Sequence, residues 1–374
     1  MDHRATTAWI DLAAIRANFR HLRDIAQGSI VCPVIKADAY GHGALAIAHE
    51  LEREGAQFCS VALAKEALDL RESGIQMPLL IFGAPEHSSS SLAIRLECAQ
   101  TIYTEEHVRI LASAAKSVGK KAKAHIKIDT GMNRQGLPWT KARSFAGLLA
   151  DYPEIFVEGI YSHFADADSP DPSFTDLQMK RFSIALESFE RVGITPKYRH
   201  IANSAGMVLY PKTRLDMVRP GILLYGLRPA PNIELPEGFE PALALTTGIV
   251  HIREVPAEES ISYGRTFTTK RFSRIGLMPI GYADGYPRAL SNRASVLIRG
   301  VRAPVVGRVC MDMTMIDLTG IAGARVGDEV LLFGGRTLPV SEISNLLSTI
   351  DYEVVCMISK RVPRVHIDSK PQEE

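Results

Sequence analysis

The chain has 374 residues, 46% of them hydrophobic and 23% charged, which is ordinary for a globular protein and long enough for two domains. A formal net charge of +1 favours neither nucleic acid nor an anionic membrane as a partner. No apolar run approaches the roughly 18 residues of a membrane span, and the first residues lack the apolar core of a signal peptide, so we expect a cytoplasmic protein. The five cysteines are widely spaced without a C-x-x-C pair, which argues against disulfides or structural zinc.

Up to about residue 235, short apolar runs alternate with amphipathic stretches. A helix is predicted over residues 11–27, where apolar residues recur at helical spacing. Eight apolar runs follow, each continued by a turn or a helix: 31–36, 57–62, 78–83, 100–104, 122–129, 155–163, 198–203 and 216–222. This alternation predicts a parallel sheet, and eight units predict a closed (β/α)8 barrel like that of TIM-barrel proteins. An open doubly wound sheet is the alternative, although no G-x-G-x-x-G follows an early strand.

The pattern changes beyond residue 235, after a proline-rich linker. Short β-branched runs separated by turns predict strands over 245–255, 274–280, 294–298, 303–309, 313–318, 329–333 and 364–368, with one helix over 340–347. We therefore expect a barrel domain over residues 11–235. A mostly antiparallel β domain is expected over residues 236–374, together with residues 1–10.

Lys36 ends the first predicted barrel strand, where its stem lies among apolar neighbours. Partial burial disfavours the ammonium form, so the pKa of such a lysine falls and its amine becomes nucleophilic. Gly41 and Gly43 allow a tight turn before a helix begins at Ala44. A lysine that extends its amine to solvent is the ordinary alternative for one isolated residue.

Four further predicted strands also end in polar residues. These residues are Lys127 with Arg134 beyond it, His163, Asn203 with Ser204, and Arg219 with Gly221. The carboxyl ends of barrel strands meet at one mouth, where barrel enzymes carry out their chemistry. Ser204 at a helix start, with the backbone amides of Gly221 and Ile222, forms a candidate phosphate cradle to which Tyr40 and Tyr352 can add hydroxyls. An amine nucleophile beside a phosphate cradle fits pyridoxal 5'-phosphate.

Seven motifs extend along nearly the whole chain. They are VIKADAYGHG at 34–43, KIDTGM at 127–132, HIANS at 200–204, RPGI at 219–222, SYG at 262–264, GYADGY at 281–286 and GRVCMD at 307–312. Together they resemble the bacterial alanine racemases, fold-type III pyridoxal-phosphate enzymes with a barrel and a β domain. The resemblance implies an isomerase that interconverts L-alanine and D-alanine and supplies D-alanine for cell-wall peptidoglycan.

The resemblance also implies roles for particular residues. Lys36 and Tyr263 would be two bases on opposite faces of the substrate, and His163 would lie beside Tyr263 and touch Arg219, which faces the pyridine nitrogen. The cofactor-binding set would comprise Lys36, Tyr40, His163, Asn203, Ser204, Arg219, Gly221, Ile222 and Tyr352. Arg134 and the backbone amide of Met311 would bind the substrate carboxylate.

Further expectations follow from the same resemblance. Lys127 matches a lysine that is carbamylated in many relatives. The residues that would line the substrate's access corridor are Asp168, Tyr282, Arg288 and Arg308. The β domain of one subunit would complete the site of the other, which implies a homodimer. Asn133 stands where many relatives have glycine, Phe267 replaces a polar aromatic residue, and His366 stands where tyrosine is common.

Three alternatives remain open at this point. A serine or broader-specificity racemase would share the same machinery. A metal-dependent barrel hydrolase could use carboxylate and imidazole ligands, for which the candidates are Asp129, His163, Asp166, Asp168 and His200. A non-catalytic cofactor-carrying barrel is the third, but it would need no second domain.

Overall fold

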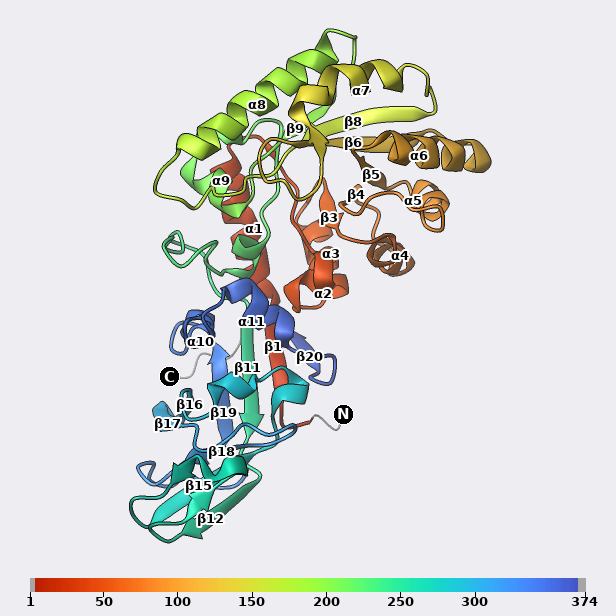
Figure 1. Cartoon of the computed structure of the whole chain (residues 1–374). Helices are drawn as coiled ribbons and strands as arrows, with labels where there is room; N and C mark the ends of the chain where they lie inside the picture. Colours follow the sequence, from red (N-terminus) through yellow and green to blue (C-terminus); the bar gives the residue numbers. More distant parts are fainter. Residues whose placement is uncertain (1–3, 369–374) are drawn as a thin grey trace.

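The computed structural model describes residues 4–368 and gives an elongated molecule, with helices and parallel strands at one end and a β-rich part at the other (Figure 1). Residues 1–3 and 369–374, which the predicted β domain includes, lie outside the described residues. No helix in the described part is both long and apolar enough to cross a membrane.

Eight parallel strands of the first part form the barrel wall. They are β2 (Ile30–Val31), β3 (Cys59–Val61), β4 (Leu79–Ile81), β5 (Ala99–Ile102), β6 (Ala122–Asp129), β8 (Ile155–Tyr161), β9 (Tyr198–His200) and β10 (Met217–Val218). Strands β3 to β9 pair in parallel in chain order, and β10 pairs in parallel with β2. The short strand β7 (Leu137–Pro138) pairs with β6 outside this order.

Backbone hydrogen bonds at two places close these strands into a ring. Next to β2, the N–H of Ile35 donates to the carbonyl of Ser60, and the N–H of Ser60 donates to the carbonyl of Pro33, both at 2.9 Å. Next to β10, the N–H of Arg219 donates to the carbonyl of Ala202 at 2.9 Å, which joins β10 to β9. The predicted (β/α)8 barrel is confirmed.

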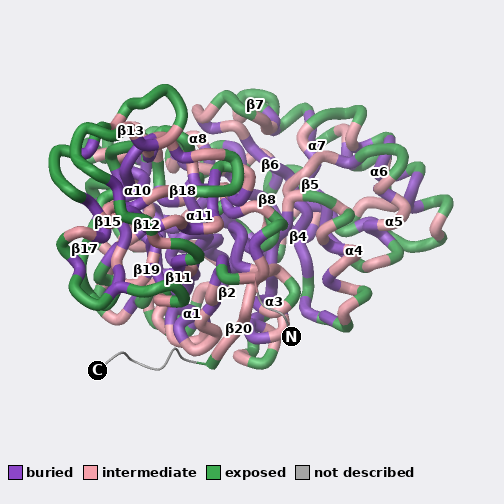
Figure 2. Tube along the Cα trace, turned by 90° about the horizontal axis from the view of Figure 1, so that it is seen from below, coloured by how far each residue is buried: buried purple, intermediate pink, exposed green. Residues whose placement is uncertain are grey.

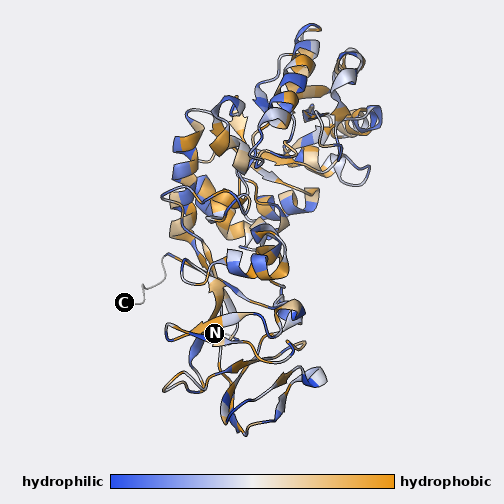
Figure 3. Ribbon diagram, turned by 60° about the vertical axis from the view of Figure 1, so that its left-hand side comes forward, coloured by the Kyte–Doolittle hydropathy of each residue, from blue (hydrophilic) through white to orange (hydrophobic). Residues whose placement is uncertain are grey.

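One long helix precedes the barrel strands and the others follow them, and together they surround the barrel (Figure 1). They are α1 (Leu12–Ala26), α3 (Ala44–Arg53), α4 (Ala64–Glu72), α5 (Ser90–Arg95), α6 (Glu105–Val118), α7 (Ala142–Leu149), α8 (Ser173–Glu190) and α9 (Ser204–Leu209). Their ends follow local chemistry: Asp11 accepts a hydrogen bond from the Ala14 N–H at the start of α1, and Gly119 ends α6 with a left-handed φ of 71°. Hydrophilic and hydrophobic residues alternate around these helices (Figure 3), as expected where one face packs on the barrel.

The second part contains a larger sheet that is antiparallel except at one edge, a smaller antiparallel sheet and a hairpin. The larger sheet has the order β17–β16–β19–β11–β1–β20. Its strands are β1 (Thr7–Asp11), β11 (Leu243–Gly248), β16 (Ser295–Ile298), β17 (Val301–Pro304), β19 (Glu329–Gly334) and β20 (Arg364–Ile367). The smaller sheet joins β12 (His251–Val255), β15 (Ser273–Met278) and β18 (Thr314–Asp317), and β13 (Ser260–Ile261) pairs with β14 (Phe267–Thr268). Among the described strands of this part, only β1 and β20 pair in parallel, so the mostly antiparallel character is confirmed.

Two element predictions in this part are wrong. The run over 245–255 is not one strand, because the chain changes sheets between β11 and β12: Ile249 donates to the carbonyl of Asp328, and Val250 donates to that of Leu277. The sequence reading also missed helix α11 (Asp351–Met357), which follows α10 (Val340–Leu347) and buries Val354 and Val355. A seven-residue helix is too short for periodicity to distinguish it from a strand.

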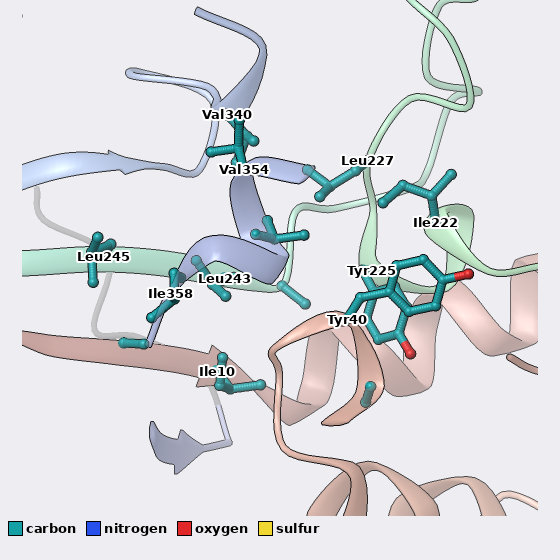
Figure 4. Close-up of a cluster of buried hydrophobic side chains, with 14 of the residues drawn as sticks. Ile10, Tyr40, Ile222, Tyr225, Leu227, Leu243, Leu245, Val340, Val354 and Ile358 are labelled. Carbon is teal, nitrogen blue, oxygen red and sulfur yellow. The ribbon is translucent and has the colours of Figure 1, made fainter. Parts of the chain in front are cut away.

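One apolar core crosses the junction between the barrel and the β-rich part. Figure 4 shows Leu243, on β11 of the larger sheet, beside Ile358, which directly follows α11, with Tyr40 and Tyr225 side by side on the barrel side. Buried residues follow the strands and inner helix faces, whereas exposed residues concentrate in the connecting loops (Figure 2). The barrel mouth is therefore held against the β-rich part by shared packing.

Candidate active site

Lys36 is followed by a left-handed turn rather than by the end of a regular strand. The four residues from Ala37 to Tyr40 have φ values between 53° and 55°, in the region that L-residues avoid. Such a conformation costs roughly 1–2 kcal/mol for each non-glycine residue. Gly41 and Gly43 continue the turn with φ values of 82° and 92°, and α3 then begins at Ala44. The predicted tight turn is present, but strain held at this place is an additional feature of the site.

Glu66 in the first turn of α4 fixes this strained turn. Its carboxylate accepts hydrogen bonds from the backbone N–H groups of Ala37 (2.7 Å), Ala62 (2.7 Å) and Leu63 (3.1 Å). The amide next to Lys36 is thereby held to the start of α4. The sequence reading missed this role, because an acid in the first turn of a helix ordinarily caps its own helix.

We expect Glu66→Gln to lower the free energy of unfolding by about 1–2 kcal/mol, because hydrogen bonds to a charged group are replaced by weaker ones. Turnover should fall as well, since the turn positions Lys36. Denaturant unfolding and steady-state kinetics measure the two effects. Glu72→Gln, an exposed residue of the same helix, is the matched control and should change neither. Equal behaviour of the two variants would contradict the role of Glu66.

Lys36 and Lys127 lie among cations at the carboxyl ends of their strands. Burial, followed by the positive charge of Arg134, lowers the pKa of Lys36 below the ordinary lysine value. Burial and the charges of Arg134, Arg219 and Lys36 lower the pKa of Lys127 to about 7. Lys127 is 4% exposed, and its Nζ lies 5.6 Å from the centre of the Tyr161 ring. Both amines therefore reach the neutral, nucleophilic form far more readily than a surface lysine.

Arg219 is held rigidly between β8, β9 and β10. Its Nη2 donates to the carbonyls of Ser162 (2.7 Å) and Ile201 (3.2 Å) and lies 3.3 Å from His163 Nδ1. Its Nη1 lies 2.6 Å from His200 Nδ1. The guanidinium is 3% exposed, and burial lowers its pKa to about 10, so it remains a cation at neutral pH. The structure thus brings Arg219 and His163 together as expected.

The candidate phosphate cradle is assembled from three parts of the chain. The backbone N–H of Gly221 donates to Ser204 Oγ at 3.0 Å, and the Tyr40 ring packs at a tilt against the rings of Tyr225 and Tyr352, at centroid separations of 5.1 and 5.9 Å. A Cβ atom on Gly221 would lie 2.6 Å from the Tyr40 hydroxyl oxygen. Only glycine leaves this space open, which fits a bound anion in contact with backbone.

Asn203 and Ile222 frame the cradle in different ways. The side chain of Asn203 accepts a hydrogen bond from the Gly206 N–H (2.9 Å) and caps α9. Ile222 is fully buried and begins a 3-10 turn (Ile222–Tyr225). In this chain Asn203 therefore positions Ser204, and Ile222 holds the loop that carries Gly221.

Arg134 is exposed on the loop after β6. Within residues 4–368 its guanidinium forms no hydrogen bond or ion pair, so it can meet an incoming carboxylate. The loop is folded by Asp129, whose Oδ1 accepts from the N–H groups of Gly131 (2.9 Å) and Asn133 (3.1 Å). Asn133 has a φ of 54°. Asparagine tolerates this left-handed conformation, which explains how it can replace glycine here.

The residues that the β domain is expected to contribute to the active site lie away from the barrel mouth in the single chain. Tyr263, Tyr282, Arg288 and Met311 line a hollow of about 960 Å³ whose lining includes no barrel residue. Tyr263 is 73% exposed and begins a 3-10 turn (Tyr263–Arg265). One chain by itself therefore does not bring Tyr263 to Lys36.

The other residues expected to line the access corridor, and the residues that differ from the family pattern, lie in both parts of the molecule. Arg308 lies beside the hollow, where its carbonyl accepts from Ser262 Oγ (2.8 Å). Asp168 lies on the barrel side, and its carbonyl accepts from Asn232 (2.7 Å). Phe267 packs at the hairpin, and His366 Nε2 lies 2.9 Å from the carbonyl of His42.

The ligand candidates for a metal-dependent hydrolase do not converge. Among residues 4–368 there is no group of three or more His, Cys, Asp or Glu side chains arranged to hold a metal ion. Asp129 accepts backbone hydrogen bonds in its loop, and His200 lies between Arg219 and His125. These contacts give that alternative no support.

Two sequence-family models match the chain consecutively. "Alanine racemase, N-terminal domain" matches residues 10–229, and "Alanine racemase, C-terminal domain" matches residues 242–366. The chain belongs to the alanine racemase family. The family resemblance read from the motifs is confirmed, and the protein is an isomerase of this family.

The chain is similar to known alanine racemases over nearly its full length. The alanine racemase of Desulfovibrio desulfuricans is 44% identical over 366 residues, which cover 98% of this chain and 99% of the relative. That of Methanococcus maripaludis is 42% identical, covering 96% and 98%. The solved alanine racemase from Streptomyces lavendulae has a TM-score of 0.94 and 34% identity, covering 99% of this chain and 98% of that one. A solved alanine racemase from Clostridium difficile 630 gives 0.93 and 37%, covering 97% and 95%.

Proposed function

We propose that the protein interconverts L-alanine and D-alanine with pyridoxal 5'-phosphate, using Lys36 and Tyr263 as two bases. The observation that carries this proposal is that Lys36 and Arg219 lie at one barrel mouth, where the charges of both act on Lys127 and His163, with the Gly221 cradle against Tyr40. The cofactor supplies an aldehyde that bonds an amine and a ring that withdraws electrons and acidifies the Cα–H bond.

The residues of the mouth fit this cofactor part by part. Tyr40, Ser204, Tyr352 and the backbone amides of Gly221 and Ile222 would hold the phosphate, with Asn203 positioning Ser204. The Lys36 amine would bond the aldehyde, and its lowered pKa supports that role. Arg219 would face the ring nitrogen, and since an arginine keeps its proton it would donate a hydrogen bond there without transferring that proton.

Racemisation needs a proton removed from one face of Cα and returned to the other. Lys36 would serve one face once the substrate amine has displaced it. Tyr263 would serve the other, with His163 beside it: Nδ1 of His163 faces the Arg219 guanidinium and accepts, so its Nε2–H would donate a hydrogen bond. His163 remains neutral because burial, followed by the charge of Arg219, lowers its pKa well below the usual histidine value.

The second base implies that the site is shared between two subunits. Tyr263 is exposed, and Tyr282, Met311 and Met313 are exposed beside it, which is unusual for large apolar side chains. A homodimer in which this face covers the partner's barrel mouth would bury them and place Tyr263 opposite Lys36. Asp168, Tyr282, Arg288 and Arg308 would then line the access corridor between the subunits.

Substrate recognition would depend on the α-carboxylate. Arg134, which has no partner within the described residues, and the backbone amide of Met311 would bind it. The alanine racemase from Bacillus anthracis has been solved with bound L-Ala-P, which supports an alanine-sized substrate here. A panel of L-amino acids with chiral product analysis tests the proposal: alanine should racemise fastest. Faster turnover of serine or of larger amino acids would favour the broader-specificity alternative.

The physiological role that we propose is the supply of D-alanine for cell-wall peptidoglycan. A bacterium that lacks its own alanine racemase requires external D-alanine, so expression of this chain should restore growth without it. The Lys36→Ala variant is the negative control. Absence of growth with the unaltered chain would contradict this role.

Lys127 is proposed to carry a carbamate, which would replace a cation beside Arg134 by an anion that orients it. Only the neutral amine reacts with carbon dioxide, so with a pKa of about 7 the reactive form predominates above pH 7 and is lost as the pH falls below it. Intact-mass spectra in bicarbonate should therefore show the added mass of one carbon dioxide above pH 7 and less of it below.

Activity should depend on this carbamate. We expect Lys127→Ala to lower turnover about 10²-fold, since Arg134 would lose the anion that positions it. Acetate should restore part of the activity by occupying the vacated space. Lys141→Ala, on the surface of the barrel, is the control and should not respond to acetate. An unmodified mass together with unchanged turnover of Lys127→Ala would contradict the proposal.

A further inference from the structure

A row of buried polar side chains crosses the barrel interior from Arg219, and the proposed mechanism does not use it. His200 Nε2 lies 2.9 Å from His125 Nδ1, and His125 Nε2 lies 3.3 Å from Glu158 Oε2. Both histidines are fully buried, and Glu158 is 9% exposed. Nη1 of Arg219 lies 2.6 Å from His200 Nδ1. The four side chains therefore form one hydrogen-bonded row that runs from Arg219 to the Glu158 carboxylate.

The direction of every hydrogen bond in this row is fixed by its first member. A guanidinium can only donate, so Nδ1 of His200 must accept and its single proton must lie on Nε2. That Nε2–H then donates to Nδ1 of His125, whose own Nε2–H donates to the Glu158 carboxylate. Burial lowers the pKa of both histidines, so each remains neutral with one proton.

Glu158 can end the row as an anion. Burial opposes its ionisation, but the hydrogen bond from His125 and the charges of Lys123 and Lys197 outweigh that effect, and the pKa of its carboxyl lies below the usual value. Arg219 itself has no carboxylate partner among the ion pairs of the described residues. The row therefore joins a buried cation to the carboxylate that lies at its other end.

The local fold is built to admit this row. The pairing of β6 with β8 shifts register between Ala124 and His125, which pair with Val157 and Gly159, so that Glu158 is the extra, unpaired residue of a bulge in β8. A Cβ atom on Gly159 would lie 2.4 Å from His125 Nδ1, so only glycine leaves room for the imidazole. The Tyr161 ring stacks on His200 at a centroid distance of 4.8 Å and an interplanar angle of 5°. The imidazole rings of His125 and His200 are therefore held in place by the residues packed against them.

We propose that Glu158 and His125 are positioning residues that fix the tautomers of both histidines and thereby hold Arg219 in its catalytic orientation. The inference rests on the proposed role of Arg219 toward the cofactor ring. Without the carboxylate, His125 can move its proton to Nδ1, and His200 must then move its own proton to Nδ1. An N–H of His200 would face an N–H of the guanidinium, which disfavours the present position of Arg219.

Neutron diffraction from crystals of the perdeuterated holoenzyme tests the proton positions directly. Deuterium is expected on Nε2 of His125 and of His200, with Nδ1 bare in both rings. Deuterium on Nδ1 of either ring would overturn the proposal. This measurement needs no variant and no turnover, so it stands apart from the proposed function, which fails separately if the unaltered enzyme does not racemise alanine.

Glu158→Gln, an isosteric change, tests the consequence. We expect deuterium on Nδ1 in part of the molecules and a fall in kcat of about tenfold or more, as for loss of a hydrogen bond to a charged group. The KM for alanine should change little, because the carboxylate-binding groups are elsewhere. Glu154→Gln, which removes an outer ion pair with Lys116 (3.1 Å) just before β8, is the control and should keep kcat. Unchanged kcat and tautomers in Glu158→Gln would overturn the proposal.

Discussion

Replacing Lys36 by alanine is expected to lower racemisation by more than about 10⁴-fold, because one change removes both a nucleophilic amine and one of the two bases. The half-buried position of this amine and its lowered pKa make it the strongest nucleophile candidate at the mouth. Activity is measured by chiral analysis of products from each enantiomer of alanine. The absorbance of bound pyridoxal phosphate should also change, since the covalent link to the protein is lost.

Two controls separate chemistry from folding in this experiment. Lys65→Ala removes an exposed lysine of α4 that pairs with Asp69 and should leave activity unchanged. Small primary amines added to Lys36→Ala should restore part of the activity, because they can supply the missing base. A Lys36→Ala enzyme that retains more than about a hundredth of the normal rate would contradict the assignment.

Tyr263→Phe is expected to lower racemisation by about 10²–10⁴-fold, the usual contribution of one acid–base group. The variant should lose exchange of the Cα proton at only one of the two faces. In deuterium oxide the variant should exchange the Cα proton of only one alanine enantiomer, without inversion, because Lys36 still serves its own face. Tyr152→Phe, at a tyrosine that packs against the barrel core and does not line the hollow around Tyr263, is the control. Exchange of both enantiomers at equal rates would contradict a two-base mechanism.

A mixture of the two inactive variants tests whether the site is shared. In a dimer of Lys36→Ala with Tyr263→Phe, one site would carry both changes and the other neither. Random assembly should then restore about one quarter of the normal activity, since half of the dimers are mixed and each has one intact site. A site formed within one chain would give no recovery at all, because neither chain would then hold both bases.

The barrel could be predicted because its information is local. Apolar runs, helical spacing and residues that cap helices, including Asp11 and Gly119, fix strands and helices within a few residues of where they form. The strand order then follows from right-handed strand–helix–strand units. The motifs around Lys36 and Arg219 placed those residues at strand ends, and the parallel barrel brings strand ends together.

Local patterns fail where a long-range contact decides the outcome. The strand over residues 245–255 reads as continuous, but backbone bonds to Asp328 and Leu277 divide it between two sheets. Residues 37–40 have no sequence signal for a left-handed turn, which Glu66 and the following glycines hold in place. The backbone preference of L-residues at positions 37–40 is for a negative φ, the opposite of the conformation that they adopt.

The sequence by itself determined the barrel, the β-rich part that follows it, the family and the identity of the chemical groups, because periodicity, turn residues and motifs are properties of neighbouring residues. Only the tertiary structure decided which groups meet. His125 contacts His200 across 75 residues and Glu158 across 33, and the register shift that permits this leaves no pattern in the sequence. Tyr263 likewise lies outside the barrel mouth of its own chain, since the packing of whole sheets, not the local sequence, sets its position.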